Sequence, residues 1–335
     1  MEYRILGGSG MSVSRLSLGT MLFGAQTDEA TSHRIIARAF EAGINFIDTA
    51  DNYVGGRAEE IVGAAIRPNR RDWVLATKMA NPMGGNRLHR GLSRRWMMEE
   101  IDASLKRLGT DWVDVLYLHK EDHATPLEVT VRALGDMIRA GKIRSFGVSN
   151  YRGWRIAEIC AICDREGIDR PVVSEPYYNI LNRQPEVEQL PAAARYGLGI
   201  VPYSPLARGV LTAKYQPGSA PPDGTRAALK DRRMMETEWR EESLVIAQTL
   251  AEHAKARGTT PTHFAMGWLL CQKGITGMVV GPRTMEQLED YLGAFSYRFT
   301  AEDAALVDSL VTPGHPSSAG YNDPQYPLEW RVTPG

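Results

Sequence analysis

Short runs of β-branched and aliphatic residues alternate with longer amphipathic stretches along most of the chain. Eight such runs, each bounded by turn residues, predict strands: Leu16 to Gly19, Ile44 to Asp48, Trp73 to Thr77, Val113 to Leu118, Ile143 to Val148, Val172 to Ser174, Gly199 to Tyr203 and Met278 to Gly281. Between them, apolar residues recur every three or four positions, as Ile101, Leu105 and Leu108 do, which predicts helices. Apolar strands that alternate with helices are typical of a parallel sheet covered by helices.

Eight strand–helix units are the number that closes into a barrel, so we expect a (β/α)8 TIM barrel of the α/β class. A doubly wound open sheet is the main alternative that the pattern leaves open. Before the first unit, Gly7-Gly8-Ser9-Gly10 predicts the turn of an N-terminal β-hairpin. Three stretches exceed the usual length of a connection, 80–91, 204–240 and 312–335, and we expect long loops at the carboxyl-terminal face of the strands.

Length and composition are compatible with one large domain. A chain of 335 residues can form one barrel or two smaller domains, and its 43% of hydrophobic residues is enough for a large core. No shift in composition marks a linker. We therefore expect a single domain over residues 1–335, in which residues 312–335 form a tail over the mouth of the active site.

Charge and cysteine content limit the possible binding partners of the protein and the cellular compartment in which it is expected. The formal net charge of -1 provides no basic surface for a nucleic acid or an anionic membrane, and no apolar run reaches the ~20 residues of a membrane span. Three cysteines cannot form a disulfide framework, which favours a reducing compartment. We expect a cytoplasmic protein whose partner is a small molecule.

Four ionisable side chains follow consecutive predicted strands. Asp48 ends the second strand and Tyr53 follows it, while Lys78 and His119 end the third and fourth strands. The carboxyl ends of barrel strands meet at one face, where barrel active sites form, so we expect these side chains to lie together. Each alone is more often a cap, a packing residue or a solvated charge, and their joint placement carries the prediction.

Their chemistry suits the interconversion of a carbonyl and an alcohol. Tyrosine has an ordinary pKa near ~10, which a neighbouring cation such as Lys78 lowers toward neutrality. Asp48 would supply the counter-charge that keeps Lys78 protonated near the barrel core. His119 would then orient or polarise the carbonyl oxygen, or help to pass the proton.

The same residues resemble a known family. Asp48-Thr49-Ala50 with Tyr53, Ala76-Thr77-Lys78 and Leu116-Tyr117-Leu118-His119 are similar to the tetrad of the aldo-keto reductase superfamily. The resemblance begins at Leu18-Gly19-Thr20-Met21 and continues to about residue 311. It implies a barrel that binds NADPH or NADP+ without a Rossmann fold, with Tyr53 as general acid toward a small-molecule carbonyl substrate.

The resemblance also implies a set of cofactor contacts in the second half of the chain. Ser149 and Asn150 resemble the pair that binds the nicotinamide carboxamide, and Tyr203 resembles the aromatic residue on which the nicotinamide stacks. The segment from Tyr203 to Tyr215 is similar to the loop around the pyrophosphate. The predicted contacts up to this loop are Thr20, Ser149, Asn150, Glu175, Tyr203, Ser204, Pro205, Leu206, Gly209, Leu211 and Lys214.

A second group of predicted contacts follows the eighth strand. Gly281-Pro282-Arg283 leads into a predicted helix, and an arginine beside a helix N-terminus favours a phosphate. We therefore expect NADPH rather than NADH. Gln287 and Asp290 match the family's positions near the adenine, whereas Tyr291 replaces the family's Asn.

Glu175 is another departure from the family pattern, because the family commonly has Gln at this position of the sixth strand. An ionised glutamate accepts hydrogen bonds from the carboxamide but donates none. We expect this replacement to change cofactor affinity or the balance between oxidised and reduced cofactor.

Several other signals have ordinary structural explanations. His119 and His123 have the spacing of a helical zinc site, but a strand end and Pro126 flank them, and we expect no metal. Cys160 and Cys163 lie in a helical pattern and are expected to be buried core. The pairs Arg94-Arg95 and Arg232-Arg233 are expected to be solvated surface. An alternative function is that of a redox-sensing regulatory subunit, similar to the potassium-channel β subunits that share this barrel.

Overall fold

The computed structural model describes residues 1–327, and residues 328–335 of the predicted tail lie outside the described residues. The chain groups into two compact units. The first comprises Met1–Tyr177, Pro185–Tyr203 and Leu270–Gly293, and the second comprises Tyr178–Gln184, Ser204–Leu269 and the chain from Ala294 onward. The expectation of a single domain over residues 1–335 stays a prediction.

Eight parallel strands form a nearly closed barrel in the first unit, which confirms the predicted fold class. They follow the order β10-β3-β4-β5-β6-β7-β8-β9. Their bounds are β3 (Leu16–Gly19), β4 (Phe46–Asp48), β5 (Val74–Met79), β6 (Val113–Leu118), β7 (Ile143–Ser149), β8 (Val173–Glu175), β9 (Gly199–Ile200) and β10 (Met278–Val280). Beyond this ladder, Thr276 and Val279 donate backbone hydrogen bonds to Ile200 and Pro202, which join the last two strands.

The predicted N-terminal hairpin is present. Strands β1 (Tyr3–Ile5) and β2 (Ser12–Ser14) pair antiparallel, and the turn between them carries Gly7 at a φ of +51°. A Cβ on Gly7 would lie 2.1 Å from the carbonyl oxygen of Val172, just before β8, so only glycine fits this close approach. The hairpin therefore packs against the amino-terminal end of the barrel.

The barrel interior is filled from the hairpin side. Leu6 and Val13 of the hairpin join a buried cluster that includes Phe46, Val115 and Tyr117 from the strands. Each of these side chains is at most 1% exposed. The polar side chains described below therefore lie toward the opposite, carboxyl-terminal end of the strands.

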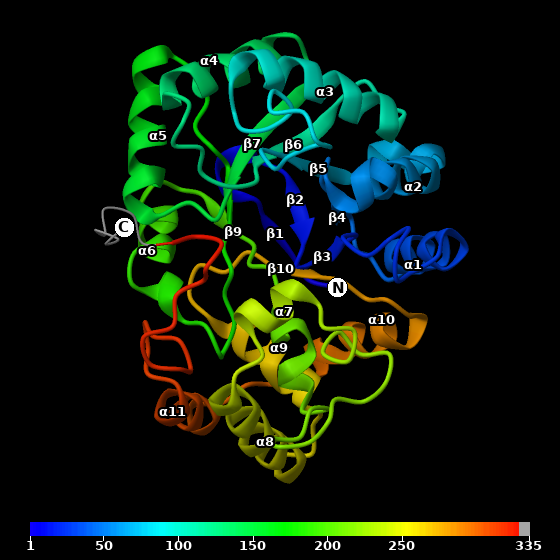
Figure 1. Cartoon of the computed structure of the whole chain (residues 1–335), viewed down its shortest axis with the longest axis vertical. Helices are drawn as coiled ribbons and strands as arrows, with labels where there is room; N and C mark the ends of the chain where they lie inside the picture. Colours follow the sequence, from blue (N-terminus) through cyan, green and yellow to red (C-terminus); the bar gives the residue numbers. More distant parts are fainter. Residues whose placement is uncertain (328–335) are drawn as a thin grey trace. The chain divides into compact units, whose positions relative to one another are not determined.

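Helices of the first unit follow the strands, and α1 to α5 lie in order outside β3 to β7 (Figure 1). Their bounds are α1 (Glu29–Glu41), α2 (Arg57–Ile66), α3 (Arg94–Leu108), α4 (Leu127–Arg139), α5 (Gly153–Glu166), α6 (Gln189–Arg195) and α10 (Met285–Leu292). Side chains cap several N-termini, as when Asp28 accepts a hydrogen bond from the Thr31 N–H. Gly109 and Gly167 end α3 and α5 in the left-handed conformation.

The second unit is helical. It contains α7 (Arg232–Thr237), α8 (Glu241–Ala256), most of α9 (Pro261–Cys271) and α11 (Ala301–Leu310). The stretch 204–240 was expected to be a loop, yet it holds a 3-10 helix, η5 (Ala207–Thr212), as well as α7. α7 forms because Asp231 caps its N-terminus and Met234 is buried.

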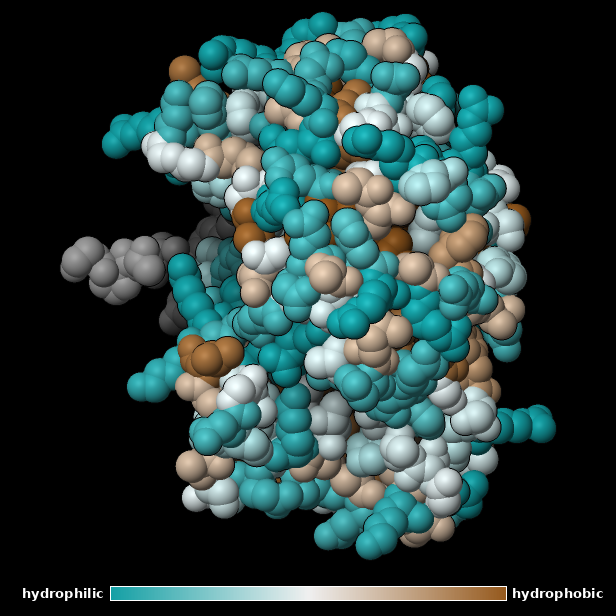
Figure 2. Space-filling view, turned by 90° about the vertical axis from the view of Figure 1, so that its right-hand side faces the viewer, coloured by the Kyte–Doolittle hydropathy of each residue, from teal (hydrophilic) through white to brown (hydrophobic). Residues whose placement is uncertain are grey.

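Within the described residues 1–327, no helix has both the length and the apolar character required to span a bilayer. On the face shown in Figure 2, hydrophilic residues predominate and the hydrophobic ones are scattered among them. Single exposed hydrophobic residues of this kind are normal on protein surfaces.

Candidate active site

The carboxyl-terminal ends of β3 to β6 carry a compact group of polar side chains. Asp48 is the last residue of β4, Lys78 is the penultimate residue of β5, and His119 directly follows β6. Thr20 follows β3, and its hydroxyl donates a hydrogen bond of 3.0 Å to the backbone carbonyl of Asp48. Parallel register places Asp48 beside Ala76 and Lys78 beside Tyr117, so the barrel brings these strand ends together.

Tyr53 reaches this group through a sharp turn after β4. It begins a short 3-10 segment, η2 (Tyr53–Gly56), in which Val54, Gly55 and Gly56 all have positive φ angles of 50°, 64° and 96°. A valine in the left-handed region is unusual and stores backbone strain, which clusters at functional sites. The turn holds the Tyr53 hydroxyl 3.4 Å from Lys78 Nζ.

Lys78 is completely buried and paired. Its ammonium group donates hydrogen bonds to Asp48 Oδ2 and, at 3.1 Å, to the backbone carbonyl of Thr49. Burial alone would lower the pKa of Lys78, but the charges of Asp48 and Glu175 outweigh it and raise the pKa. Lys78 is therefore a permanent cation behind Tyr53.

The pKa of Tyr53 differs from the sequence expectation. Burial raises it above its ordinary value, and the charge of Lys78 only partly opposes this increase because Asp48 and Glu175 act in the other direction. Tyr53 nevertheless keeps part of its surface exposed, unlike Asp48 and Lys78. The arrangement yields a protonated phenol at the surface of the site with a buried ion pair behind it.

His119 lies beside Tyr53, with ring centroids 5.8 Å apart in an edge-to-face arrangement. Burial, followed by the charges of Lys78 and Lys120, holds the pKa of His119 well below its ordinary value, so its imidazole is neutral. The side-chain nitrogen of Asn81 lies 3.1 Å from Nδ1. Sequence reasoning missed Asn81, which lies in the irregular loop after β5.

Glu175 contacts the ion pair from the other side. It ends β8, is 3% exposed, and places Oε1 3.6 Å from Lys78 Nζ. From the sequence we expected a cofactor contact here and missed this approach to Lys78. A lysine enclosed by two carboxyl groups is the main electrostatic feature of the site.

Ser149, Asn150 and Tyr203 form a linked group next to Glu175. Tyr203 donates a hydrogen bond of 2.8 Å to Asn150 Oδ1, and the Ser149 hydroxyl donates one of 2.9 Å to the Glu175 carbonyl. Asn150 has a φ of +58° and also bonds to the His119 carbonyl at 2.9 Å. The Tyr203 ring stacks on Tyr177 with centroids 5.6 Å apart. The structure thus brings three predicted cofactor residues close to the polar group around Lys78.

Arg283 lies at the entry to α10, as expected. Its guanidinium donates a hydrogen bond of 3.1 Å to Gln26, and its backbone N–H donates one of 2.8 Å to the Gln287 side chain. Thr284 caps the helix through its side chain. Gly281 precedes this turn, and its α-carbon has room for a close approach because a Cβ there would meet only the Gly19 carbonyl, at 3.7 Å. Asp290 lies within α10.

The remaining predicted cofactor residues belong to the second unit. Ser204, Ala207, Arg208, Gly209 and Ala213 all have positive φ angles, between 47° and 97°. Such a series of left-handed residues turns backbone N–H groups to one side, which is typical of anion-binding loops. A Cβ on Gly209 would lie 2.8 Å from Lys214 Nζ, so the absence of a side chain lets the ammonium rest on the loop. Pro205, Leu206 and Leu211 complete the segment.

The model of the aldo/keto reductase family matches residues 15–312, which span the barrel and the polar group described above. The chain belongs to the aldo/keto reductase family. Membership of this family supports an oxidoreductase.

Three relatives are similar to this aldo/keto reductase over nearly their whole length. A rice (Oryza sativa subsp. japonica) protein named probable voltage-gated potassium channel subunit beta is 35% identical over 93% of this chain and 97% of its own. One of the same name from Arabidopsis thaliana is 36% identical over 88% of this chain and 91% of its own. The uncharacterized oxidoreductase YrpG of Bacillus subtilis (strain 168) is 34% identical over 96% of this chain and 99% of its own.

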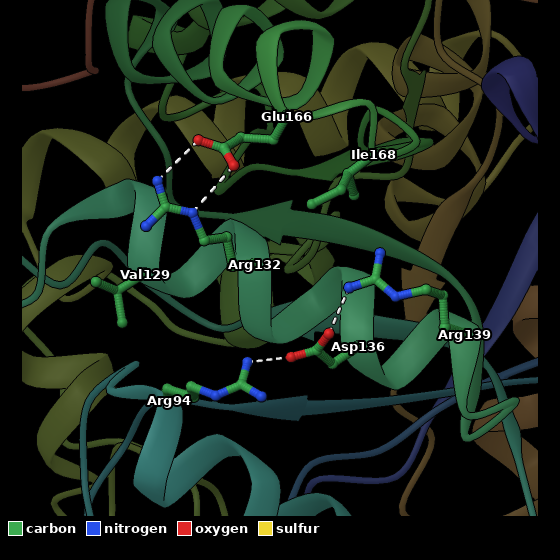
Figure 3. A pocket seen from close by; sticks show the side chains of 7 residues that line it. All are labelled: Arg94, Val129, Arg132, Asp136, Arg139, Glu166 and Ile168. Carbon is green, nitrogen blue, oxygen red and sulfur yellow. Dashed lines mark hydrogen bonds and ion pairs between the residues drawn. The ribbon is translucent and has the colours of Figure 1, made fainter.

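Outside the polar group, the aldo/keto reductase barrel has a surface depression between α3, α4 and α5 (Figure 3). Its charged side chains are engaged with one another. Arg94 and Arg139 both point to Asp136, and Arg132 forms a bidentate pair with Glu166 at 2.9 and 3.0 Å. The charged side chains that line the depression therefore form surface ion pairs, which contribute little to stability.

The cysteine and histidine pairs of this aldo/keto reductase have structural explanations as well. Cys160 and Cys163 are buried in α5, where burial raises the pKa of both thiols, to about 11 and about 12. His119 and His123 share no helix, since α4 begins only at Leu127. Among residues 1–327, no group of three or more His, Cys, Asp and Glu side chains is arranged to hold a metal ion.

Proposed function

We propose that this protein is an NADPH-dependent reductase that converts an aldehyde or ketone into an alcohol. The observation that carries the proposal is the partly exposed Tyr53, whose hydroxyl lies 3.4 Å from Lys78, together with the buried Asp48 that pairs with Lys78. A phenol backed by a buried cation suits a proton donor to a carbonyl oxygen. Family membership supports the wider class of oxidoreductase.

The residues around Glu175 fit the nicotinamide end of the cofactor. The half-exposed ring of Tyr203 offers a flat surface for stacking, and Tyr177 supports it from beneath. Ser149 and Asn150 are held beside this ring by hydrogen bonds to Glu175 and Tyr203, where they suit the carboxamide group. Rigid side chains of this kind pre-organise a binding site.

The structure offers two candidate sites for the phosphate groups of NADPH, one for the 2′-phosphate and one for the pyrophosphate. Arg283 at the N-terminus of α10 suits the 2′-phosphate that distinguishes NADPH from NADH. The left-handed loop around Gly209, with Lys214 resting on it, suits the pyrophosphate. Gln287 and Asp290 on α10 remain the proposed contacts of the adenine portion.

The side chains of the site then have distinct tasks. When bound, NADPH supplies the hydride that reduces the carbonyl carbon. Tyr53 donates its hydroxyl proton to the carbonyl oxygen, and Lys78 stabilises the phenolate that remains. Neutral His119, with Nδ1 facing Asn81, donates a hydrogen bond from Nε2 to the same oxygen.

The raised pKa of Tyr53 agrees with this assignment. A phenol that stays protonated near neutral pH carries the proton that the reaction transfers to the carbonyl oxygen. The oxygen of the reduced carbonyl is more basic than a phenolate, so transfer from Tyr53 remains favourable. Lys78 keeps its charge throughout, because its own pKa is raised.

The test is multiple-turnover oxidation of NADPH with a panel of aldehydes and ketones that includes methylglyoxal, aromatic aldehydes, pyridoxal, sugars and quinones. Turnover with at least one class of carbonyl supports the proposal. No turnover with any of them, despite tight NADPH binding, would contradict it.

A second candidate is a cofactor-bound regulatory subunit, and its support is the similarity to the rice and Arabidopsis proteins named as probable potassium-channel subunits. Such a role predicts a single slow oxidation of bound NADPH instead of sustained turnover. The same kinetic experiment therefore distinguishes the two candidates.

A further inference from the structure

Three ionisable side chains share one buried space at the centre of the site. Asp48, Lys78 and Glu175 are 2%, 0% and 3% exposed, and they come from β4, β5 and β8. Lys78 Nζ donates a hydrogen bond to Asp48 and lies 3.6 Å from Glu175 Oε1. The group thus contains one cation and two carboxyl groups.

The charge count of this group is unbalanced if both carboxyl groups are ionised. A single positive charge would then face two negative charges in a space without solvent, and an uncompensated buried charge costs several kcal/mol. Proteins relieve such a cost by protonating one carboxyl group. Burial raises the pKa of both carboxyl groups, but Asp48 has the direct hydrogen bond to Lys78, so we assign the proton to Glu175.

Three observations on Glu175 agree with this. Its Oε2 atom is buried and has no hydrogen-bond partner within residues 1–327. Burial and the charge of Asp48 raise the pKa of Glu175 well above its ordinary value, and Lys78 only partly opposes them. The other ionisable groups that face it are the phenols of Tyr53 and Tyr117, and both are neutral because their own pKa values are raised.

We propose that Glu175 is held as a neutral carboxylic acid and that binding of NADP+, but not of NADPH, releases its proton. The inference rests on the proposed function, because it uses the position of the nicotinamide next to Ser149 and Asn150, which bond to the Glu175 backbone. The oxidised ring carries a positive charge that favours the carboxylate, whereas the reduced ring is neutral. As an acid, Glu175 also keeps one donor and one acceptor, as an amide does.

The coupling between proton release and NADP+ binding determines how the affinity for NADP+ changes with pH. A ligand that favours the ionised form binds more tightly as the pH rises, because less work is needed to remove the proton. The Kd of NADP+ should therefore fall with rising pH, by up to about tenfold per pH unit for one linked proton, whereas the Kd of NADPH should stay nearly constant. Release of NADP+ after reduction should therefore be fastest at low pH, where NADP+ binds most weakly.

The first test locates the proton without any cofactor. Infrared spectra of the protein are compared with those of Glu175→Gln, a substitution of nearly identical shape that cannot ionise. We expect the carbonyl band of a protonated carboxylic acid at neutral pH, and its loss in the variant. If the two spectra agree in this region, Glu175 is not a neutral acid and the proposal is overturned.

The second test measures the coupling. Kd values of NADP+ and NADPH are determined by fluorescence between about pH 6 and about pH 9, the range that buried carboxyl groups reach. In the wild-type protein only the NADP+ value should depend on pH, and Glu175→Gln should abolish the dependence. An unchanged dependence in the variant would overturn the coupling.

Glu100→Gln is the matched control. Glu100 is 3% exposed and its pKa is also raised by burial, but it pairs with Arg107 on α3 instead of Lys78. This variant should keep the acid band of Glu175 and the pH dependence of NADP+ binding. If the wild-type protein bound neither cofactor, the proposed function would fail, while the infrared comparison would still decide the state of Glu175.

Discussion

The side-chain nitrogen of Asn81 lies 3.1 Å from Nδ1 of His119. This contact leaves Nδ1 as an acceptor and assigns the single imidazole proton to Nε2, because the pKa of His119 is held well below its ordinary value. Asn81 therefore sets the tautomer of His119, and in the proposed function it is the positioning residue for the hydrogen bond from His119 to the carbonyl oxygen.

Replacement of Asn81 by aspartate should create a new pH dependence. A carboxylate beside Nδ1 holds a proton on that nitrogen and raises the pKa of His119. As the pH rises through this raised pKa, Nε2 loses its proton and the hydrogen bond to the carbonyl oxygen, so kcat should fall. Asn81→Ala should lower kcat by about tenfold without a new pKa. Profiles of kcat against pH check this, and a profile of Asn81→Asp that parallels the wild type would contradict it.

Tyr53→Phe should remove the proton donor and leave the cofactor contacts in place. We expect kcat to fall by about 10² to 10⁴-fold, the usual contribution of a general acid, with little change in the Kd of NADPH. Stopped-flow turnover and fluorescence titration measure the two quantities. Full activity of this variant would refute the assignment of Tyr53.

Arg283→Ala should act on one cofactor only. A charge-assisted hydrogen bond contributes about 1.5–3 kcal/mol, so the KM of NADPH should rise by roughly tenfold to a hundredfold. The KM of NADH should change little, because NADH has no 2′-phosphate. Arg38→Ala is a matched control, since Arg38 pairs with Glu289 on the outer side of α10. Equal effects of Arg283→Ala on both cofactors would argue against the phosphate contact.

The stability of the folded protein should decrease at low pH because of Asp303 in the second unit. Burial opposes ionisation, but hydrogen bonds from His253, Tyr297 and Thr300 outweigh it and lower the pKa of Asp303 to about 2. The lowered pKa contributes about 2 kcal/mol of stability above about pH 4, which is lost as the pH falls toward 2. Asp303→Asn should lose this contribution at neutral pH. Urea unfolding at several pH values measures it, and a constant difference between variant and wild type down to pH 2 would exclude this origin.

The strands and the main polar group could be predicted because they depend on local pattern. Most barrel strands are short runs of mainly apolar, buried residues, and Asp48 and His119 stand where such a run ends. The contact of Glu175 with Lys78 depends on how two strands that are not neighbours, β5 and β8, curve around the barrel, which no spacing along the chain encodes. Asn81 lies in an irregular loop, and η5 and α7 are too short to have a clear periodicity.

The predicted cofactor contacts could be placed only in part from the sequence. The structure brings Ser149, Asn150 and Tyr203 together, and it places Arg283 at a helix N-terminus, whereas Ser204 to Lys214 belong to the second unit. The catalytic and binding roles of all these residues remain predictions for the experiments above.

The hairpin closes the amino-terminal end of the barrel. Leu6 and Val13 pack into the buried cluster inside the barrel, and Gly7 fits directly against the Val172 carbonyl. The proposed chemistry is therefore confined to the carboxyl-terminal face of the strands. A tether attached to the hairpin would lie at the opposite end of the barrel from Tyr53.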